Sequence, residues 1–498
     1  MNHKSLVFSL QVKLMSPSTD DKDGDADRLR NGLKEIGIHN VEIPLHILRR
    51  LPDALRESSF EVKPILGAQG QGYRLIDMKK KSLYGIALDI GTTNMSCSLF
   101  DLDACKKVDT YDIENPQLCY GTDILARVQR SMIEDSGGLT DSLIEGINVL
   151  INTICERNSM GSDEVCCLVV SGNTIMSHYF LGLDVRNIPV TPFIPSINGP
   201  VFTSAGETGI KIYKEASVYV FPNSGSYVGG DIISGILCSG IQKEEEPALF
   251  IDVGTNVELV LGCRDWIVVG AGAAGPALED GVAGIGKKAE KGSIFGITIY
   301  RDTKTAALRV IGDAEPEGIC GSGMIDLVAE LFSAGIIDQA GKFVDSGGGI
   351  KENNGEKVYM LSETRGKELV ISEKEVQNFL RSKAAMFAFL YVFVKAVGMR
   401  LREIKKVFVG GSMGCGINLE NAIKIGMLPD LPRERFIPVG NSSLCGAEMV
   451  LCNRNVLDEI ENIRSKITYR EMGEDPELLN VLQAGLFIPH TEPEILRG

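Results

Sequence analysis

The segment YGIALDIGTTNMSCSLFDL, residues 84–102, decides how this chain is expected to fold. It predicts an apolar strand, a tight turn at Asp89-Ile-Gly-Thr-Thr and a second apolar strand. The same pattern returns at residues 248–262, ALFIDVGTNVELVLG, where the turn is Asp252-Val-Gly-Thr-Asn. Two copies of one strand–turn–strand unit predict two similar lobes that face each other across a cleft.

The two turns have the composition of a phosphate-binding site. A glycine allows backbone N–H groups to approach an anion closely, and threonine or asparagine side chains add donors. An aspartate at a strand end is placed to hold Mg²⁺ through water. One such turn alone is more typical of an ordinary hairpin, but two copies favour phosphoryl transfer, in which one turn holds phosphate and metal and the other orients water. The residues assigned to these roles are Asp89, Gly91, Thr92, Thr93, Asp252, Gly254, Thr255 and Asn256.

A third glycine turn follows the apolar run VFV in VFVGGSMG, residues 407–414. There Gly410, Gly411 and Ser412 are expected to let the backbone pass beneath a nucleoside. Another glycine turn opens the predicted helix GICGSGMIDLVAEL, residues 318–331, and its N-terminus can face an anion. Close packing explains that turn equally well, so both interpretations stand for Gly318, Gly321 and Gly323. The chain holds neither GxxxxGK[ST] nor a GxGxxG after a strand, which disfavours P-loop and Rossmann sites.

Composition excludes several other classes of function. Lys and Arg total 51 against 66 Asp and Glu, and the net charge of −15 would repel nucleic acid and anionic lipid. No apolar run reaches the roughly 18 residues of a membrane helix, and the polar residues Ser9, Gln11 and Lys13 interrupt the N-terminal apolar patch, unlike a secretory signal. We therefore predict a cytoplasmic protein that binds neither nucleic acid nor membrane. The 12 cysteines begin at Cys97 without a CxxC pair, which predicts reduced core thiols, and His178 is expected to be a core residue.

Taken in order, DIGTTN, DVGTN and VFVGGS resemble the two phosphate motifs and the adenosine motif of the actin, sugar-kinase and heat-shock-chaperone ATPase superfamily. The closer resemblance is to one branch, the ATP-dependent reductive activators of corrinoid proteins. It implies an α/β, two-lobed actin-like ATPase fold with a small N-terminal α+β domain. The implied domains are residues 1–80, residues 81–248 as the first lobe, and residues 249–498 as the second lobe with a C-terminal helical extension. The segments that carry the closer resemblance are ENPQ (114–117), YGTDILARV (120–128), SGNTIMSHYFLG (171–182), FPNSGSYVGGDIISGIL (221–237), GAAGPALE (272–279), GICGSGMIDLVAEL (318–331), INLENAIKIGMLPDLP (417–432), VGNSSLCGAEM (439–449) and AGLFIPHTE (484–492).

The resemblance also implies a function. A member of this branch uses ATP and Mg²⁺ to promote cobalt(II) to cobalt(I) reduction in the corrinoid protein of a methyltransferase system, and a homodimer is expected. Such members begin with a domain that carries a two-iron two-sulfur cluster on four cysteines. Because no cysteine precedes Cys97, we expect no iron–sulfur cluster in this chain and a separate ferredoxin or flavodoxin-type electron donor. Two alternatives stay open, an ATP-binding regulatory protein without redox activity and a small-molecule kinase.

This chain departs from the branch at one point near the second turn. Val257 stands where the branch has a glycine. A valine there can narrow the phosphate turn, which makes ATP hydrolysis a question separate from ATP binding.

Overall fold

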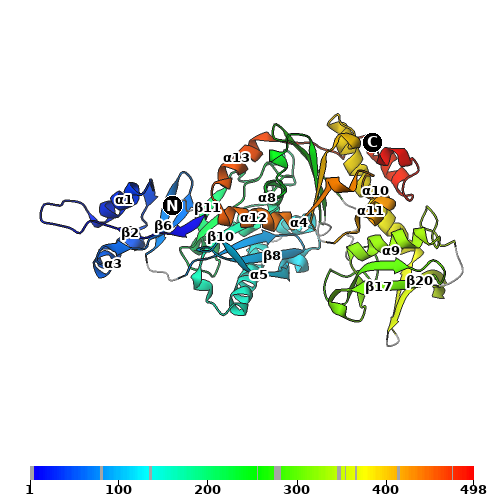
Figure 1. The fold of residues 1–498 in the computed structure, drawn as a ribbon, viewed down its shortest axis with the longest axis horizontal. Coiled ribbons are helices and arrows are strands. Elements are labelled where there is room, and N and C mark those ends of the chain that lie inside the picture. The colour runs from blue at the N-terminus through cyan, green and yellow to red at the C-terminus, as the bar shows by residue number, and fades with distance from the viewer. Residues whose placement is uncertain are drawn as a thin grey trace. The chain divides into compact units, whose positions relative to one another are not determined.

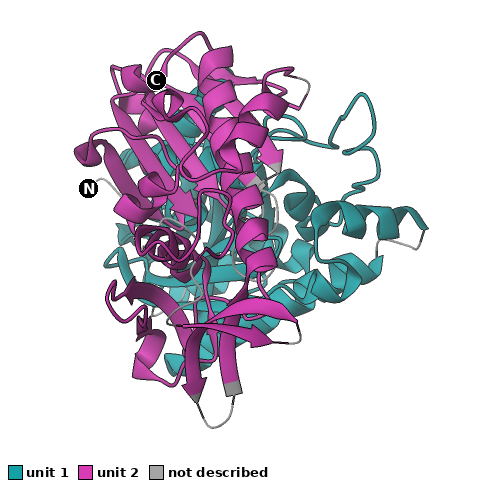
Figure 2. Ribbon diagram, turned by 90° about the vertical axis from the view of Figure 1, so that its right-hand side faces the viewer, with its two compact units in different colours: residues 1–238, 443–465 teal, residues 239–442, 466–498 magenta. Residues whose placement is uncertain are grey.

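The computed structural model describes most of the chain in two compact units, which Figure 2 colours separately. Unit 1 comprises residues 1–238 and 443–465, and unit 2 comprises residues 239–442 and 466–498. The described ranges are 5–78, 82–133, 137–254, 256–273, 282–344, 349–353, 355–364, 367–411, 416–473 and 475–497, without the side chains of residues 256, 273, 364 and 367.

The N-terminal part of unit 1 is a small α+β arrangement. Its sheet has the order β1-β5-β6-β3, and a second ladder pairs β2 with β4. β5 and β6 form an antiparallel hairpin across a glycine turn. Leu29, Leu33, Ile47 and Leu55 of the helices are buried between these elements. The elements are β1 (Val7–Ser9), β2 (Val12–Lys13), α1 (Asp25–Glu35), β3 (Val41–Glu42), α2 (Leu45–Leu48), α3 (Leu51–Glu57), β4 (Glu61–Val62), β5 (Ile65–Gln69) and β6 (Gly72–Asp77).

The main sheet of unit 1 has the order β11-β12-β10-β7-β8-β9. Figure 1 labels its strands β8, β10 and β11. β7, β8 and β9 form an antiparallel meander, and β10 and β12 continue the sheet in parallel with β7. Every residue of β10 is buried, as expected for a parallel strand that is covered on both faces. The strands are β7 (Tyr84–Ile90), β8 (Asn94–Asp101), β9 (Lys106–Glu114), β10 (Val165–Gly172), β11 (Val201–Ser204) and β12 (Ser217–Val220).

Helices complete unit 1. α5 packs against β8 and β9 and buries Leu143, Ile147, Leu150 and Ile154 along one face, at helical spacing. The helices are α4 (Ile124–Ile133), α5 (Gly137–Arg157), α6 (Thr174–Phe180), α7 (Ala205–Thr208), α8 (Gly230–Ser239), α12 (Ser442–Cys452) and α13 (Val456–Lys466). Three terminal residues of these helices, Ser239, Ser442 and Lys466, fall in unit 2.

The main sheet of unit 2 repeats this topology. Its order is β23-β22-β13-β14-β15-β24. β13, β14 and β15 form the antiparallel meander, and β22 and β23 continue the sheet in parallel with β13. The duplication predicted from the two turn motifs is therefore confirmed over five strands of each sheet, while the sixth strand is β11 beside β12 in unit 1 and β24 beside β15 in unit 2. The strands are β13 (Ala248–Val253), β14 (Asn256–Gly262), β15 (Ile267–Ala273), β22 (Lys406–Gly411), β23 (Phe436–Gly440) and β24 (Ile467–Tyr469).

Two three-stranded sheets and four helices complete unit 2. The long helix α10 begins with a capping box between Ser372 and Glu375. Met386 and Phe387 of this helix are buried in the core of the unit. The remaining elements are β16 (Ser293–Ile299), β17 (Ala306–Val310), β18 (Gly318–Ile319), α9 (Gly321–Ser333), β19 (Ile350–Asn353), β20 (Glu356–Thr364), β21 (Lys367–Ser372), α10 (Glu373–Ala396), α11 (Leu419–Lys424) and α14 (Leu478–Gly485).

Candidate functional site

The first predicted turn joins β7 to β8 in unit 1. Asp89 lies one residue before the end of β7 and pairs in register with Ser96 of β8 and Ser171 of β10. Gly91 is required sterically, because a Cβ there would lie 2.5 Å from the carbonyl oxygen of Asn94. The structure thus confirms a glycine turn between antiparallel strands, with its aspartate at the strand end.

The carbonyl groups of this turn are held by the protein. Asn115 Nδ2 donates to the oxygen of Gly91 at 2.8 Å, and the Asn115 backbone N–H donates to the oxygen of Thr93 at 2.8 Å. Arg127 Nη2 donates to the oxygen of Thr92 at 2.7 Å. Because these carbonyls are fixed, the conformation of the turn is set by the protein itself.

Arg127 is fully buried, and the protein supplies acceptors for its guanidinium. Nε donates to the oxygen of Gly121 at 2.9 Å, and Nη1 donates to Gln117 Oε1 at 3.3 Å. Burial lowers the pKa of Arg127 from its ordinary value, while Tyr179 and Asp123 oppose that shift. An arginine stays charged even so, so a positive charge lies directly beneath the turn assigned to phosphate.

The second predicted turn joins β13 to β14 in unit 2. Asp252 again lies one residue before the strand ends, and it pairs in register with Glu258 of β14 and Gly410 of β22. Among the described residues, a Cβ at Gly254 would meet nothing within 4 Å, so there is space at Gly254 where the first turn is tight at Gly91. Thr255 and the side chain of Asn256 lie outside the described residues, so their assigned roles stay predictions.

Gly410 and Gly411 at the end of β22 lie against Asp252. A Cβ on Gly410 would lie 3.3 Å from Asp252 Oδ2, and one on Gly411 would lie 2.5 Å from Oδ1. Gly411 also has a φ of +72°, which L side chains rarely adopt. The structure therefore brings two of the predicted motifs together within unit 2, while Ser412 lies outside the described residues.

Comparison with known proteins shows which family shares this pair of sheets. Family models cover residues 1–82 as "RACo linker region", residues 84–244 as "RACo middle region" and residues 246–497 as "C-terminal domain of RACo the ASKHA domain". The chain belongs to the RACo family. A solved structure described as "Reductive activator for corrinoid,iron-sulfur protein" matches with a TM-score of 0.92 and 33% identity, over 99% of this chain and 80% of the other.

Two curated proteins are also similar to this RACo-family chain. The corrinoid activation enzyme RamQ of Eubacterium limosum is 28% identical over 428 residues, which is 82% of this chain and 72% of that protein. The [Co(II) methylated amine-specific corrinoid protein] reductase of Methanosarcina barkeri is 23% identical over 415 residues, 78% of this chain and 73% of that protein. The actin-like ATPase fold expected from the motifs is thereby confirmed.

Within this RACo-family fold, Val257 belongs to the core of unit 2. It is 1% exposed and lies in the apolar core together with Val253 and Leu259. Strand alternation puts its side chain on the face opposite Glu258, which pairs with Asp252. Its effect on the width of the phosphate turn stays a prediction, because the turn includes Thr255, which lies outside the described residues.

The turn before α9 is explained in large part by packing. A Cβ at Gly318 would lie 2.8 Å from the oxygen of Ile285, and one at Gly323 would overlap the oxygen of Ile294. α9 begins at Gly321, and no side chain caps its N-terminus. An anion at this helix start stays a prediction.

The structure adds polar partners that the sequence did not single out. Ser443 Oγ donates to Asp89 Oδ1 at 2.7 Å, and Ser442 Oγ donates to Asp252 Oδ2 at 2.7 Å. Asn173 Nδ2 donates to Thr92 Oγ1 at 3.3 Å. All three residues, like Asn115 and Arg127, fall in segments that carry the family resemblance. Membership of these segments is the sequence feature that could have pointed to them.

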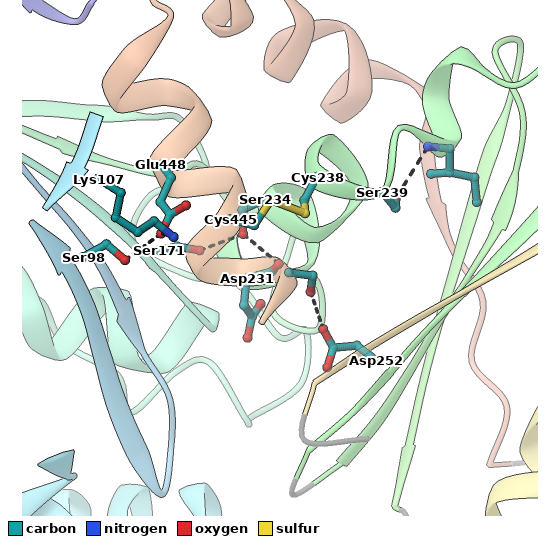
Figure 3. Close-up of a disulfide and its surroundings, with 12 residues drawn as sticks. Ser98, Lys107, Ser171, Asp231, Ser234, Cys238, Ser239, Asp252, Cys445 and Glu448 are labelled. Carbon is teal, nitrogen blue, oxygen red and sulfur yellow. Dashed lines mark hydrogen bonds and ion pairs between the residues drawn. A yellow bond between two sulfur atoms is a disulfide. The ribbon is translucent and has the colours of Figure 1, made fainter. Parts of the chain in front are cut away.

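The cysteine prediction needs correction. Cys238 of α8 and Cys445 of α12 form a disulfide, with Cα atoms 5.8 Å apart and 207 residues between them in sequence (Figure 3). Cys105 and Cys119 are exposed rather than buried. The prediction treated cysteines as isolated positions, whereas the packing of α8 against α12 brings two of them within bonding distance.

His178 is a core residue, as predicted. Its Nδ1 bonds to the oxygen of Thr174 at 2.7 Å, and its Nε2 accepts from the N–H of Ser196 at 3.1 Å. These two bonds fix the neutral tautomer with the proton on Nδ1, and burial lowers the pKa of His178. Among the described residues, no helix is long and apolar enough to cross a membrane, and no group of three or more His, Cys, Asp or Glu side chains is arranged to hold a metal.

Proposed function

We propose that this chain is an ATP-dependent activator of a corrinoid protein in a methyltransferase system. It promotes reduction of cobalt(II) to cobalt(I) with electrons from a separate donor. The observation that carries the proposal is the pair of aspartate–glycine turns at equivalent positions of two duplicated sheets. The named relatives support it, since one is a corrinoid activation enzyme and another a cobalt(II) corrinoid protein reductase.

In this proposal, the glycine turns bind the phosphates of ATP. The first turn would bind phosphate through the backbone of Gly91, Thr92 and Thr93. The carbonyl oxygens of these residues accept hydrogen bonds from Asn115 and Arg127, which fix the conformation of the turn. Gly254 would bind phosphate in the second turn. Gly410 and Gly411 would let the backbone pass beneath the nucleoside. The buried guanidinium of Arg127 lies beneath the first turn, where its charge favours an anion.

Asp89 and Asp252 are the proposed Mg²⁺ residues. Carboxylate oxygens are the donor type that this ion takes, and it is commonly held by one or two carboxylates together with water and substrate phosphate. The donor set therefore fits magnesium. When bound, Mg²⁺ would neutralise charge that develops on the phosphates. Asp252 is further proposed to orient the water that attacks the terminal phosphate.

ATP is needed because reduction to cobalt(I) is energetically uphill. For a one-electron couple, each 59 mV corresponds to a tenfold change in equilibrium, or about 1.4 kcal/mol. A gap of a few hundred millivolts therefore requires several kcal/mol. Nucleotide binding and hydrolysis can supply this by favouring one conformation of the partner over another.

The electrons are proposed to come from a ferredoxin or flavodoxin-type protein. The raised pKa values of three buried cysteines support a separate electron donor. Burial raises the pKa of Cys97 to about 12 and that of Cys155 to about 11, and it raises the pKa of Cys167 as well. A thiol must ionise before it can bind iron, so these buried cysteines are poor candidates for cluster ligands.

A cytoplasmic location and a homodimer are part of the same proposal. The acidic composition and the polar interruptions in the N-terminal segment support the location. The homodimer rests on the family resemblance, and light scattering of the purified chain tests it directly.

ATP hydrolysis tests the proposed function. The purified chain should hydrolyse ATP faster when the cobalt(II) form of its corrinoid protein is added, and Asp252→Ala should abolish that stimulation. A small-molecule kinase would instead phosphorylate a metabolite without a protein partner. A regulatory protein would bind ATP without stimulated turnover, and either result would overturn the proposal.

A further inference from the structure

Two consecutive serines begin α12, and each bonds to an aspartate of a different turn. Ser442 Oγ donates to Asp252 Oδ2 at 2.7 Å within unit 2, and Ser443 Oγ donates to Asp89 Oδ1 at 2.7 Å within unit 1. The serines are 1% and 7% exposed, respectively. A buried hydroxyl that donates to a carboxylate makes a strong, charge-assisted bond that holds the carboxylate in one orientation.

We propose that Ser442 and Ser443 are positioning residues, which orient Asp252 and Asp89 for the Mg²⁺–nucleotide. This inference rests on the proposed function, because it assigns the serines a role through aspartates that bind the metal. Partners of metal-binding carboxylates commonly contribute 10- to 100-fold to affinity or activity.

The surroundings of Ser443 show that its hydroxyl is held in place. Ser171 Oγ lies 2.9 Å from Ser443 Oγ. It also lies 2.8 Å from Ser234 Oγ, as Figure 3 shows, and Ser234 Oγ donates to the oxygen of Asp231 at 2.8 Å. Ser171 and Ser234 are 0% exposed. Ser234 donates to a carbonyl and Ser443 donates to Asp89, so the single proton of Ser171 can be donated to only one of its two serine neighbours.

The rest of α12 is also anchored within unit 1. Cys445, two residues after Ser443, is bonded to Cys238 of α8. Glu448, one turn further, accepts from Ser98 Oγ of β8 at 2.6 Å and pairs with Lys107 Nζ of β9 at 2.5 Å (Figure 3). A helix fixed at these points presents the hydroxyl group of Ser443 to Asp89 from a rigid support within unit 1, which precise positioning of a carboxylate requires.

The surroundings of Ser442 explain a glycine of the third motif. A Cβ on Gly410 would lie 3.1 Å from Ser442 Oγ and 3.3 Å from Asp252 Oδ2. Ser171 occupies the equivalent position in unit 1, since it pairs with Asp89 as Gly410 pairs with Asp252. Gly410 thus leaves room for the serine hydroxyl beside the aspartate.

Binding of Mg²⁺–AMPPNP, a non-hydrolysable ATP analogue, tests the inference by calorimetry on the full chain. Ser442→Ala and Ser443→Ala should each weaken binding about 10-fold or more, and they should raise the Mg²⁺ concentration needed for half-maximal binding. Ser442→Thr and Ser443→Thr restore the hydroxyl and should recover most of the affinity. Thermal unfolding of every variant shows whether it is folded.

Two other buried serines supply matched controls. Ser131 Oγ bonds to Tyr179 in unit 1, and Ser293 Oγ bonds to the oxygen of Lys288 in unit 2. Ser131→Ala and Ser293→Ala should lose stability without changing the Mg²⁺ dependence. If Ser442→Ala and Ser443→Ala behave like these controls, the positioning role is wrong while the proposed function stands. If the wild-type chain does not bind Mg²⁺–AMPPNP, the proposed function fails and the inference fails with it.

Discussion

Gly411 lies so close to Asp252 that a single added methyl group would lie 2.5 Å from the carboxylate oxygen Oδ1. The glycine also has a φ of +72°. The position of the Asp252 carboxylate therefore depends on the absence of a side chain at Gly411, at the end of β22, although the two residues lie far apart in sequence.

Gly411→Ala should displace Asp252 and weaken Mg²⁺–AMPPNP binding more than 10-fold, because the new methyl group and the carboxylate cannot occupy the same space. The positive φ alone costs about 1 kcal/mol. Gly398→Ala is the matched control, since Gly398 has a φ of +83° and a Cβ there meets nothing within 4 Å. Calorimetry should show a large loss of affinity for Mg²⁺–AMPPNP in Gly411→Ala and none in Gly398→Ala. Equal affinities of the two variants would show that the contact between Gly411 and Asp252 does not matter for binding.

Reduction of the Cys238–Cys445 disulfide should lower the free energy of unfolding by about 2–5 kcal/mol, because the bond closes a long loop in the unfolded chain. Urea denaturation with and without dithiothreitol measures the difference. Cys238→Ala should be insensitive to the reductant, whereas Cys119→Ala should respond like the wild type. Mass spectrometry of the non-reduced chain that found both thiols free would contradict the disulfide.

Lys383 fixes the C-terminal segment of unit 2. Its Nζ donates to the backbone oxygens of Gly485, Phe487 and Pro489 at 2.6–2.7 Å, and burial lowers its pKa to about 7. Lys383→Met leaves three buried carbonyl groups without this donor, so it should cost about 3 kcal/mol or more. It should also speed hydrogen exchange across α14.

Lys395 of the same helix provides the control for Lys383. It pairs with Glu477 at 2.7 Å, but the two side chains are 55% and 36% exposed, so water screens the pair. Lys395→Met should therefore cost less than about 1 kcal/mol. Similar losses in urea denaturation for the two variants would show that the buried contacts of Lys383 do not stabilise the segment.

Acid should destabilise the chain partly through His178. The folded pKa of His178 lies below its ordinary value of 6.5, because burial disfavours the charged ring and both nitrogens are already bonded in the neutral form. Above pH 6.5 the ring is neutral in both states. Below it the unfolded state binds the proton first, so stability falls with decreasing pH by at most about 1.4 kcal/mol per pH unit.

His178→Gln should reduce that acid sensitivity between pH 7.5 and 5.5, as measured by urea denaturation. His490 contributes in the same direction, since burial also lowers its pKa, so part of the slope should remain. His39→Gln, at an exposed position, should leave the slope unchanged. If the free energy of unfolding of His178→Gln falls with decreasing pH as steeply as that of the wild type, His178 does not contribute to the acid sensitivity.

Local sequence predicted the local structure well. The DIGTT and DVGTN motifs gave the two turns between antiparallel strands, and the apolar runs gave the central strands. The polar partners of the turns were not predicted, because Ser442 lies 190 residues from Asp252 and Ser443 lies 354 residues from Asp89. Contacts at such separations depend on how strands and helices are ordered in space, which neither periodicity nor a short motif encodes. The disulfide was missed for the same reason.

The proposed function requires that ATP use by this chain drives cobalt reduction in a corrinoid protein. A single assay tests this: the chain is mixed with ATP, Mg²⁺, a low-potential electron donor and the cobalt(II) corrinoid protein, and the cobalt(I) absorbance is followed. We expect a cobalt(I) signal that requires ATP and is lost in Asp252→Ala. Absence of an ATP-dependent signal with every donor tried, from a chain that binds Mg²⁺–AMPPNP, would contradict it.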